Sequence, residues 1–212
     1  MSKPPEEAPD ELPLGRLEAF SDGVFAIAIT ILVLDLGVSA SSGDDLLAAL
    51  IDEWPSYLAY VTSFLTLGVF WLEHSTVTSV LRAGDPILYR INLVVLLLAS
   101  FLPFPTKLAS EYFGQREPEQ IAVLFYGVTL LLLDLAITAF ARYAVQDRRL
   151  VRPGVSEETL GSLGRLPSFL IYAGAILIGL IVPTVGIVLY LAIALYQAIL
   201  SRTMRRLFRR QR

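Results

Sequence analysis

The sequence contains no cysteine, and its 212 residues include only one histidine. Without cysteine, the chain has no disulfide, thiolate metal site or cysteine nucleophile. Charged residues are also scarce, at 17%, whereas a soluble domain carries about 25%. One histidine among apolar runs offers no convincing nucleophile–base pair, so we expect neither an enzyme nor a bound cofactor.

Long apolar runs, separated by short charged segments, take up most of the chain, and 55% of all residues are hydrophobic. A helix needs about 20 apolar residues to cross a bilayer. We identify six such runs, at 17–37, 56–80, 87–108, 120–142, 166–182 and 184–201. The sequence therefore predicts an all-α polytopic membrane protein with a six-span domain over 16–201. A Pro-rich acidic segment, 1–15, precedes it and is predicted to be disordered; an Arg-rich tail, 202–212, follows it.

The basic residues predict the orientation of these spans. When the loops are assigned alternately to two sides, 15 of the 17 Lys and Arg residues fall on one side, and only Lys107 and Arg116 fall on the other. Basic loops remain in the cytoplasm, so we expect both termini there, with the Arg-rich tail on anionic lipid headgroups and not on nucleic acid. The acidic segment before the first run, and Asp22 within that run, argue against a cleaved signal peptide.

A few polar residues interrupt the first two runs. Asp22 lies six residues after Arg16, and His74 lies eight residues before Arg82, which places both roughly 9–12 Å from a cytoplasmic arginine. Trp71 shares a helical face with His74. The sequence predicts a network of Arg16, Asp22, Trp71 and His74 that joins the two helices. The alternative, an interfacial histidine and a belt tryptophan, is equally open at this point.

Two further acids lie inside apolar runs. Asp134 is deep in the run 120–142 and has no obvious partner. It acts either as a protonated hydrogen-bond donor in helix packing or as part of a proton path. We expect Glu73 to reach the cytoplasmic interface. The segment Pro183-Thr184-Val185-Gly186 contains a Thr-Val-Gly triplet, but no pore helix fits before it, so we interpret it as a tight outer turn and not as a potassium filter.

The first run has two adjacent stripes at helical spacing. Small residues form one stripe and allow close helix approach; branched apolar and aromatic residues form the other, which by periodicity alone could simply face lipid. The first stripe is Ala19, Gly23, Ala26 and Thr30, and the second is Phe20, Val24, Ile27, Ile31 and Leu34.

The start of this run carries a motif. Arg16-x-x-x-Phe20-Ser21-Asp22, followed by Gly-Val-Phe-Ala-Ile-Ala-Ile-Thr, resembles the signature of the transmembrane-protein-175 family, which comprises endolysosomal potassium channels and their bacterial homologues. Phe70-Trp71-x-x-His74 also resembles that family. The resemblance implies that a single six-span unit assembles as a homotetramer whose first helices line a central pore. It further implies an apolar constriction centred on Ile27, with Thr30, Ile31 and Leu34 toward the axis, and it maps the network onto Arg16, Asp22, Trp71 and His74.

The expected function is a potassium-selective, leak-like cation channel with a hydrophobic gate in the bacterial inner membrane, through which K⁺ ions permeate. Two alternatives stay open. A secondary ion or solute transporter would use Asp134, and a non-conducting membrane scaffold would pass no current.

Overall fold

The protein forms a bundle of long helices. The computed structural model describes residues 12–37, 45–115, 117–163 and 168–210, and these residues contain two isolated β-bridges but no strand. Four helical segments are long and apolar enough to cross a membrane. They are α1 (Leu14–Ile31) with its 3₁₀ extension η1 (Leu32–Asp35), α3 (Trp54–Ser79), α4 (Pro86–Phe101) with α5 (Pro103–Glu111), and α6 (Glu117–Gln146). The predicted all-α membrane class is confirmed.

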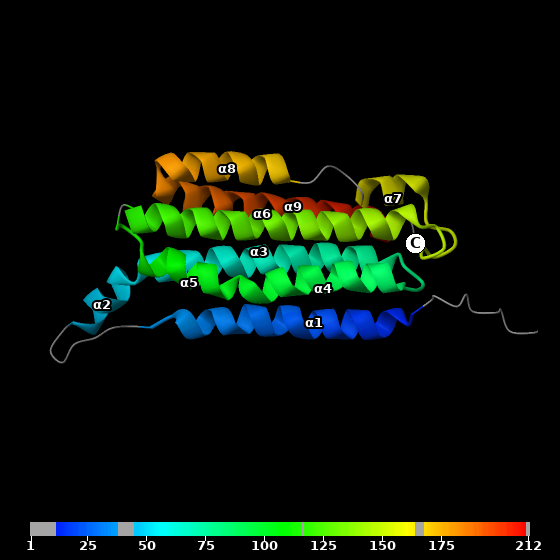
Figure 1. The fold of residues 1–212 in the computed structure, drawn as a ribbon, viewed down its shortest axis with the longest axis horizontal. Coiled ribbons are helices and arrows are strands. Elements are labelled where there is room, and N and C mark those ends of the chain that lie inside the picture. The colour runs from blue at the N-terminus through cyan, green and yellow to red at the C-terminus, as the bar shows by residue number, and fades with distance from the viewer. Residues whose placement is uncertain (1–11, 38–44, 116, 164–167, 211–212) are drawn as a thin grey trace, which may run out of the picture.

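The last two predicted spans correspond to shorter apolar helices. α8 covers Phe169–Ile181, and the apolar part of α9 (Pro183–Arg210) covers Pro183–Ile199. The 13 residues of α8 extend about 20 Å, which is less than the roughly 30 Å of a bilayer core. The count of six spans therefore stays a prediction. Two short helices, α2 (Leu46–Asp52) and α7 (Glu157–Leu163), lie at opposite ends of the bundle (Figure 1).

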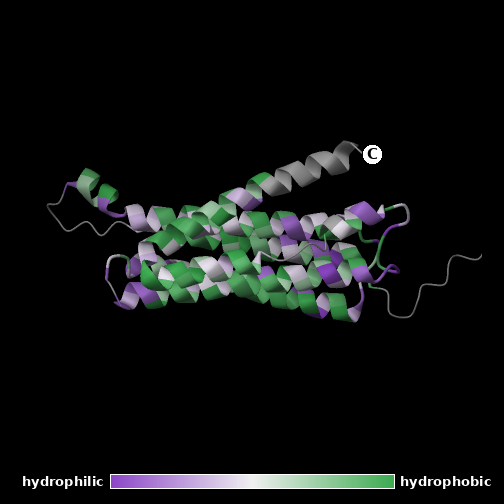
Figure 2. Cartoon of the chain, turned by 90° about the horizontal axis from the view of Figure 1, so that it is seen from above, coloured by the Kyte–Doolittle hydropathy of each residue, from purple (hydrophilic) through white to green (hydrophobic). Residues whose placement is uncertain are grey.

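The helices are arranged in layers, with α1 along one edge and α8 along the opposite edge (Figure 1). α1 packs on α3 and α4, α6 packs on α4 and α8, and α9 packs on α3 and α8. Apolar residues cover the length of the bundle, whereas hydrophilic residues gather at its ends (Figure 2). The core includes the fully buried rings of Phe25, Phe70, Phe140, Tyr172 and Tyr190.

The beginning of α1 is tied to the loop between α3 and α4. Leu12 and Gly84 exchange two backbone hydrogen bonds, of 2.7 and 3.0 Å, and the Tyr89 hydroxyl donates to the carbonyl of Pro13 at 2.6 Å. Residues 12–15 are thus ordered, although the sequence predicts disorder up to residue 15, because backbone pairing satisfies groups that a disordered chain would give to water. Residues 1–11 lie outside the described residues.

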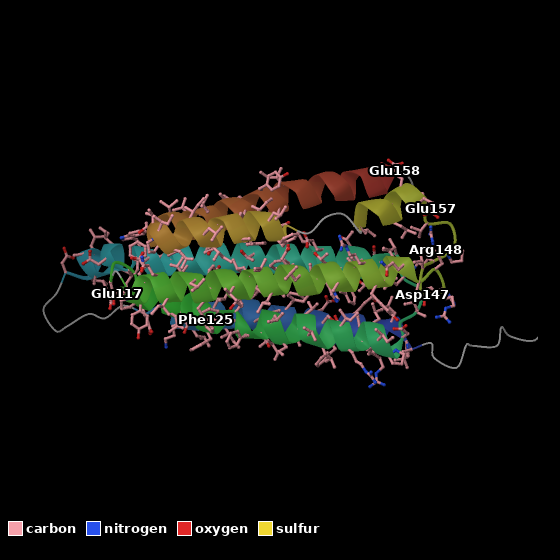
Figure 3. The ribbon with its side chains drawn as sticks, turned by 45° about the horizontal axis from the view of Figure 1, so that its top comes forward. Glu117, Phe125, Asp147, Arg148, Glu157 and Glu158 are labelled. Atoms are coloured by element: carbon pink, nitrogen blue, oxygen red, sulfur yellow. The ribbon has the colours of Figure 1, made fainter. Side chains whose placement is uncertain are left out.

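The same loop pairs with the segment that follows α6. Arg82 donates its N–H to Leu150 at 2.8 Å, and Arg152 donates to Val80 at 2.9 Å. Arg148 forms an ion pair with Glu157 of α7 (Figure 3). Nearby, the guanidinium of Arg149 holds the pKa of the Asp147 carboxyl below its usual range. α9 extends through the Arg-rich tail as far as Arg210, and the side chains of the tail lie outside the described part of the structure.

The Thr-Val-Gly segment does not form the predicted tight turn between two helices. The connection between α8 and α9 is Val182 alone, and Pro183–Gly186 is the first turn of α9. Proline is favoured at such a position because its ring presets the helical φ and the missing N–H has no helical partner there. An ideal Cβ on Gly186 would lie 2.8 Å from the Cα of Gly179. The two glycines therefore let α8 and α9 approach closely at this connection.

Candidate functional site

α1 has one packed face and one uncovered face. The packed face, which includes Leu17, Ser21 and Phe25, is buried against the other helices. The uncovered face carries Phe20 and the four residues that the family resemblance places at a constriction. Those four are Ile27, which is 61% exposed, Thr30 and Ile31, which are also exposed, and Leu34, which is 78% exposed. Within one protomer, therefore, no other helix covers these side chains.

Thr30 is the polar member of this stripe. Its hydroxyl donates to the carbonyl of Ile27 in the preceding turn, at 2.9 Å. Since this bond uses the hydroxyl proton, the lone pairs of Thr30 Oγ1 remain available as acceptors on the uncovered face. The side chain can therefore offer an oxygen to a cation.

Asp22 and Trp71 connect α1 to α3. The indole Nε1–H of Trp71 donates to Asp22 Oδ1 at 2.8 Å, and both residues are exposed in the protomer. An indole nitrogen is a donor only, so it fits a carboxylate acceptor. The bond holds the motif aspartate at the edge of the uncovered face of α1, about 140° around the helix from Ile27.

A second, buried connection centres on Asn92 of α4, which sequence reasoning missed. His74 Nε2 and Asn92 Oδ1 are 2.8 Å apart, and Asn92 Nδ2 donates to Ser21 Oγ at 3.0 Å. The His74 ring stacks on Phe140 of α6 at 4.8 Å. The amide thus joins three helices, and the His74 ring extends the connection to α6. Its signal was present in the sequence, because Asn92 is the single asparagine of the chain and lies inside an apolar run.

Arg16 takes no part in these connections. Within the described part of the chain, no hydrogen bond or ion pair links it to Asp22, Trp71 or His74. Arg16 is exposed, and it precedes Ile27 by eleven residues, about three helical turns. It consequently lies on the Ile27 side of α1, turned away from Asp22. The four residues predicted to form one network are divided among an Asp22–Trp71 pair, a His74–Asn92 pair and a separate Arg16.

Two further acids, Asp134 and Glu73, lie inside the helices α6 and α3. Asp134 is buried and accepts hydrogen bonds from the backbone and side chain of Ser168. Glu73 is half-buried and close enough to Asp134 for their charges to interact, although the sequence predicts that it reaches the interface.

Comparison with known proteins identifies the family. A family model described as "Endosomal/lysosomal potassium channel TMEM175" matches residues 16–103, which contain the motif, Trp71, His74 and Asn92. A potassium channel of Streptomyces collinus is 39% identical over 160 residues, which cover 71% of this chain and 78% of that protein. The chain belongs to the TMEM175 family.

Other TMEM175 relatives agree over most of the fold. A potassium channel of Chamaesiphon minutus is 38% identical over 149 residues, 69% of this chain and 73% of that protein. The crystal structure of a lysosomal potassium-selective channel TMEM175 homologue from the same organism matches with a TM-score of 0.78 and 30% identity, over 89% of this chain and 97% of that one. The endosomal/lysosomal proton channel TMEM175 of Gallus gallus is 35% identical over 118 residues, only 23% of its length. TMEM175 is a family of ion channels, and the chain is not an enzyme.

Proposed function

We propose that this protein is a potassium-selective, leak-like channel in which the α1 helices of four identical subunits surround a central pore. The observation that carries the proposal is the uncovered stripe of α1, where Ile27, Ile31 and Leu34 are exposed although the opposite face of the helix is buried. Family membership supports it, since two bacterial relatives are named potassium channels.

The polar neighbours of the stripe favour a pore over a lipid-facing surface. A charged side chain is costly where it faces lipid inside a bilayer, and Asp22 is exposed at the edge of the uncovered face of α1. Gly23 leaves open space, since no atom would come within 4 Å of a Cβ built on it. Small residues at this position allow other helices to approach closely. A face of α1 that contacts pore water and the neighbouring subunits accounts for both the exposed aspartate and the uncovered glycine.

Selection in such a pore follows from dehydration. Ile27 and Ile31 would form rings about 6 Å apart along the axis, with Leu34, in the 3₁₀ extension η1, about 6 Å further on. Apolar rings gate by dewetting and make an ion shed water without offering ligands. Potassium sheds water more cheaply than sodium, so it passes more readily. Thr30 Oγ1, whose proton is bonded within its own helix, supplies a partial replacement for the lost water.

The charge pattern supports an orientation with both termini in the cytoplasm of a bacterial cell. Nearly all Lys and Arg residues fall on the side of the termini, as positive-inside topology requires. α9 also runs back toward the end of the bundle at which α1 begins (Figure 1). We assign the Arg-rich tail to anionic lipid headgroups at that surface.

Ion flux into liposomes that contain the purified protein tests the constriction through Ile27→Asn. A barrier lowered by about 1.4 kcal/mol raises a rate about tenfold, so we expect potassium flux to rise by about that factor and the preference over sodium to fall. Ile121→Asn on α6, where the isoleucine is 68% exposed, is the matched control and should leave both quantities unchanged.

Three results would count against the proposal. Unchanged flux and selectivity in Ile27→Asn would show that Ile27 is not at the constriction. Saturable uptake coupled to an ion gradient would identify a transporter instead. The absence of any single-channel current from the purified wild-type protein would identify a scaffold.

A further inference from the structure

Prolines separate α5 from the helix that precedes it. Pro103 begins α5, and Pro105 follows two residues later. Proline has no N–H to bond the carbonyl four residues before it, and the N–H of Leu102 bonds the carbonyl of Ala99 instead, at 3.4 Å. The regular hydrogen-bond ladder is thus interrupted between α4 and α5. The orientation of α5 therefore depends on its contacts with other helices.

Three buried hydroxyl groups connect α5 to two of those helices. Ser63 Oγ of α3 lies 2.8 Å from Thr106 Oγ1 of α5 and 2.9 Å from the Tyr126 hydroxyl oxygen of α6. All three side chains are buried. The interior of a bilayer offers no water to replace such bonds, so a group that loses its partner stays unsatisfied.

The direction of this hydroxyl chain is fixed because each hydroxyl has one proton. Thr106 Oγ1 donates to the carbonyl of Leu102 at 2.8 Å, so it accepts from Ser63. Ser63 thus uses its own proton on Thr106 and accepts from Tyr126. The chain ends at the Leu102 carbonyl, which lies between α4 and α5. Ser63 is its central member, and loss of the Ser63 hydroxyl breaks both bonds between helices.

α5 also packs where the uncovered stripe of α1 ends. It contacts α1 and, together with α3, it packs on η1 (Figure 1). Within η1, Leu32 is 1% exposed and lies in this packing, whereas Leu34 is 78% exposed on the uncovered face. A shift of α5 would therefore displace the contacts of Leu32 and, through this one short segment, the position of Leu34.

We propose that Ser63 is a positioning residue for the pore: through the hydroxyl chain it fixes α5, and α5 fixes η1 with Leu34. The inference rests on the proposed function, which places Leu34 at the pore. An apolar ring excludes water and ions while its side chains hold the narrow position. When η1 is released, the Leu34 side chains of the four subunits move apart, the pore fills with water more readily, and potassium flux rises.

A spin label on η1 tests the positioning without reference to conduction. Because the chain has no cysteine, Leu34→Cys gives a single attachment site in the full-length protein in liposomes. We expect Ser63→Ala to raise the mobility of this label. Tyr126→Phe removes one of the two bonds and should raise it less, which provides a second variant if Ser63→Ala does not fold. Unchanged mobility in the variants that fold would overturn the proposal.

Thr62→Val is the matched control for both measurements. Thr62 is as buried as Ser63, but its hydroxyl donates to the carbonyl of Leu58 within α3, at 2.7 Å. Its removal leaves the hydroxyl chain intact, so the mobility of the label and the potassium flux should both stay at the parent value. A change as large as that in Ser63→Ala would show a general loosening of α3 and overturn the proposal.

Potassium flux tests the link to the pore. The loss of one hydrogen bond of average strength between membrane helices corresponds to about a threefold change. We expect Ser63→Ala to raise the flux by about threefold or more, and to have no effect once Leu34→Ala has removed the ring. A rise that persists with Leu34→Ala would overturn the proposal, as would unchanged flux in Ser63→Ala while Ile27→Asn raises it. Unchanged flux in both Ser63→Ala and Ile27→Asn would refute the proposed pore as well.

Discussion

Replacing Asn92 by leucine would test how strongly one buried amide holds α1 in place. Asn92 is 3% exposed. Its Oδ1 lies 2.8 Å from His74 Nε2 and 3.3 Å from Ser21 Oγ, and its Nδ2 lies 3.0 Å from Ser21 Oγ. Leucine keeps the branched shape of asparagine and cannot form hydrogen bonds, but its two methyl groups are larger than the amide. The substitution therefore leaves His74 and Ser21 buried without these partners and adds volume to a packed site.

The expected loss follows from these contacts. A neutral hydrogen bond contributes about 0.5–1.5 kcal/mol net in water-soluble proteins, and the average between membrane helices is about 0.6 kcal/mol. Two partners lose bonds in Asn92→Leu, so the free energy of unfolding should fall by about 1–3 kcal/mol. The adjacent Leu93 is exposed, and Leu93→Ala should stay within about 0.5 kcal/mol of wild type.

Reversible unfolding in mixed micelles, followed by tryptophan fluorescence, measures these values. His74→Phe keeps a ring against Phe140 but removes the bond to Asn92. In the double variant with Asn92→Leu, the two losses should overlap, because the second substitution removes a bond that is already broken. Losses that add within about 0.3–0.5 kcal/mol would show independent sites and refute the proposed connection between His74 and Asn92.

Two further substitutions use the same unfolding assay. Trp71→Phe removes the 2.8 Å bond to Asp22 Oδ1 and should lower stability by about 1 kcal/mol, because the pair is exposed to solvent screening; an unchanged value would show that the bond does not fix α1. Gly186→Ala places a Cβ 2.8 Å from Gly179 Cα, which should separate α8 from α9 and cost about 1–3 kcal/mol. The control is Gly174→Ala in α8, where the new Cβ meets open space, so an equal loss in both variants would contradict the explanation by close approach.

The sequence predicts the first half of the protein well because its signals there are local. Apolar runs of sufficient length locate α1, α3 and α4 with α5, and a rise of 1.5 Å per residue places Asp22 and His74 at matching depths. Trp71, which shares a helical face with His74, is bonded to Asp22 in the structure. The motif around them also identifies the family, which the Streptomyces collinus relative confirms.

The second half is less predictable from local signals. An apolar run from 166 to 182 resembles a full span, but α8 starts only at Phe169 and ends at Ile181. Hydropathy measures how apolar a segment is, whereas the start of a helix depends on what accepts its first N–H groups. Here that acceptor includes Asp134, which is more than thirty positions earlier in the chain.

By itself, the sequence determined that the chain is helical, that it belongs in a membrane, and which polar residues enter its spans, because length, hydropathy and helical rise are properties of each segment alone. Only the tertiary structure decided the partners of those residues. In the folded protein, His74 is bonded to Asn92, Asp134 to Ser168 and Asp22 to Trp71, and Arg16 takes part in none of these bonds. The physical reason is that the rotation of each helix about its axis is fixed by packing against its neighbours, which no single segment encodes.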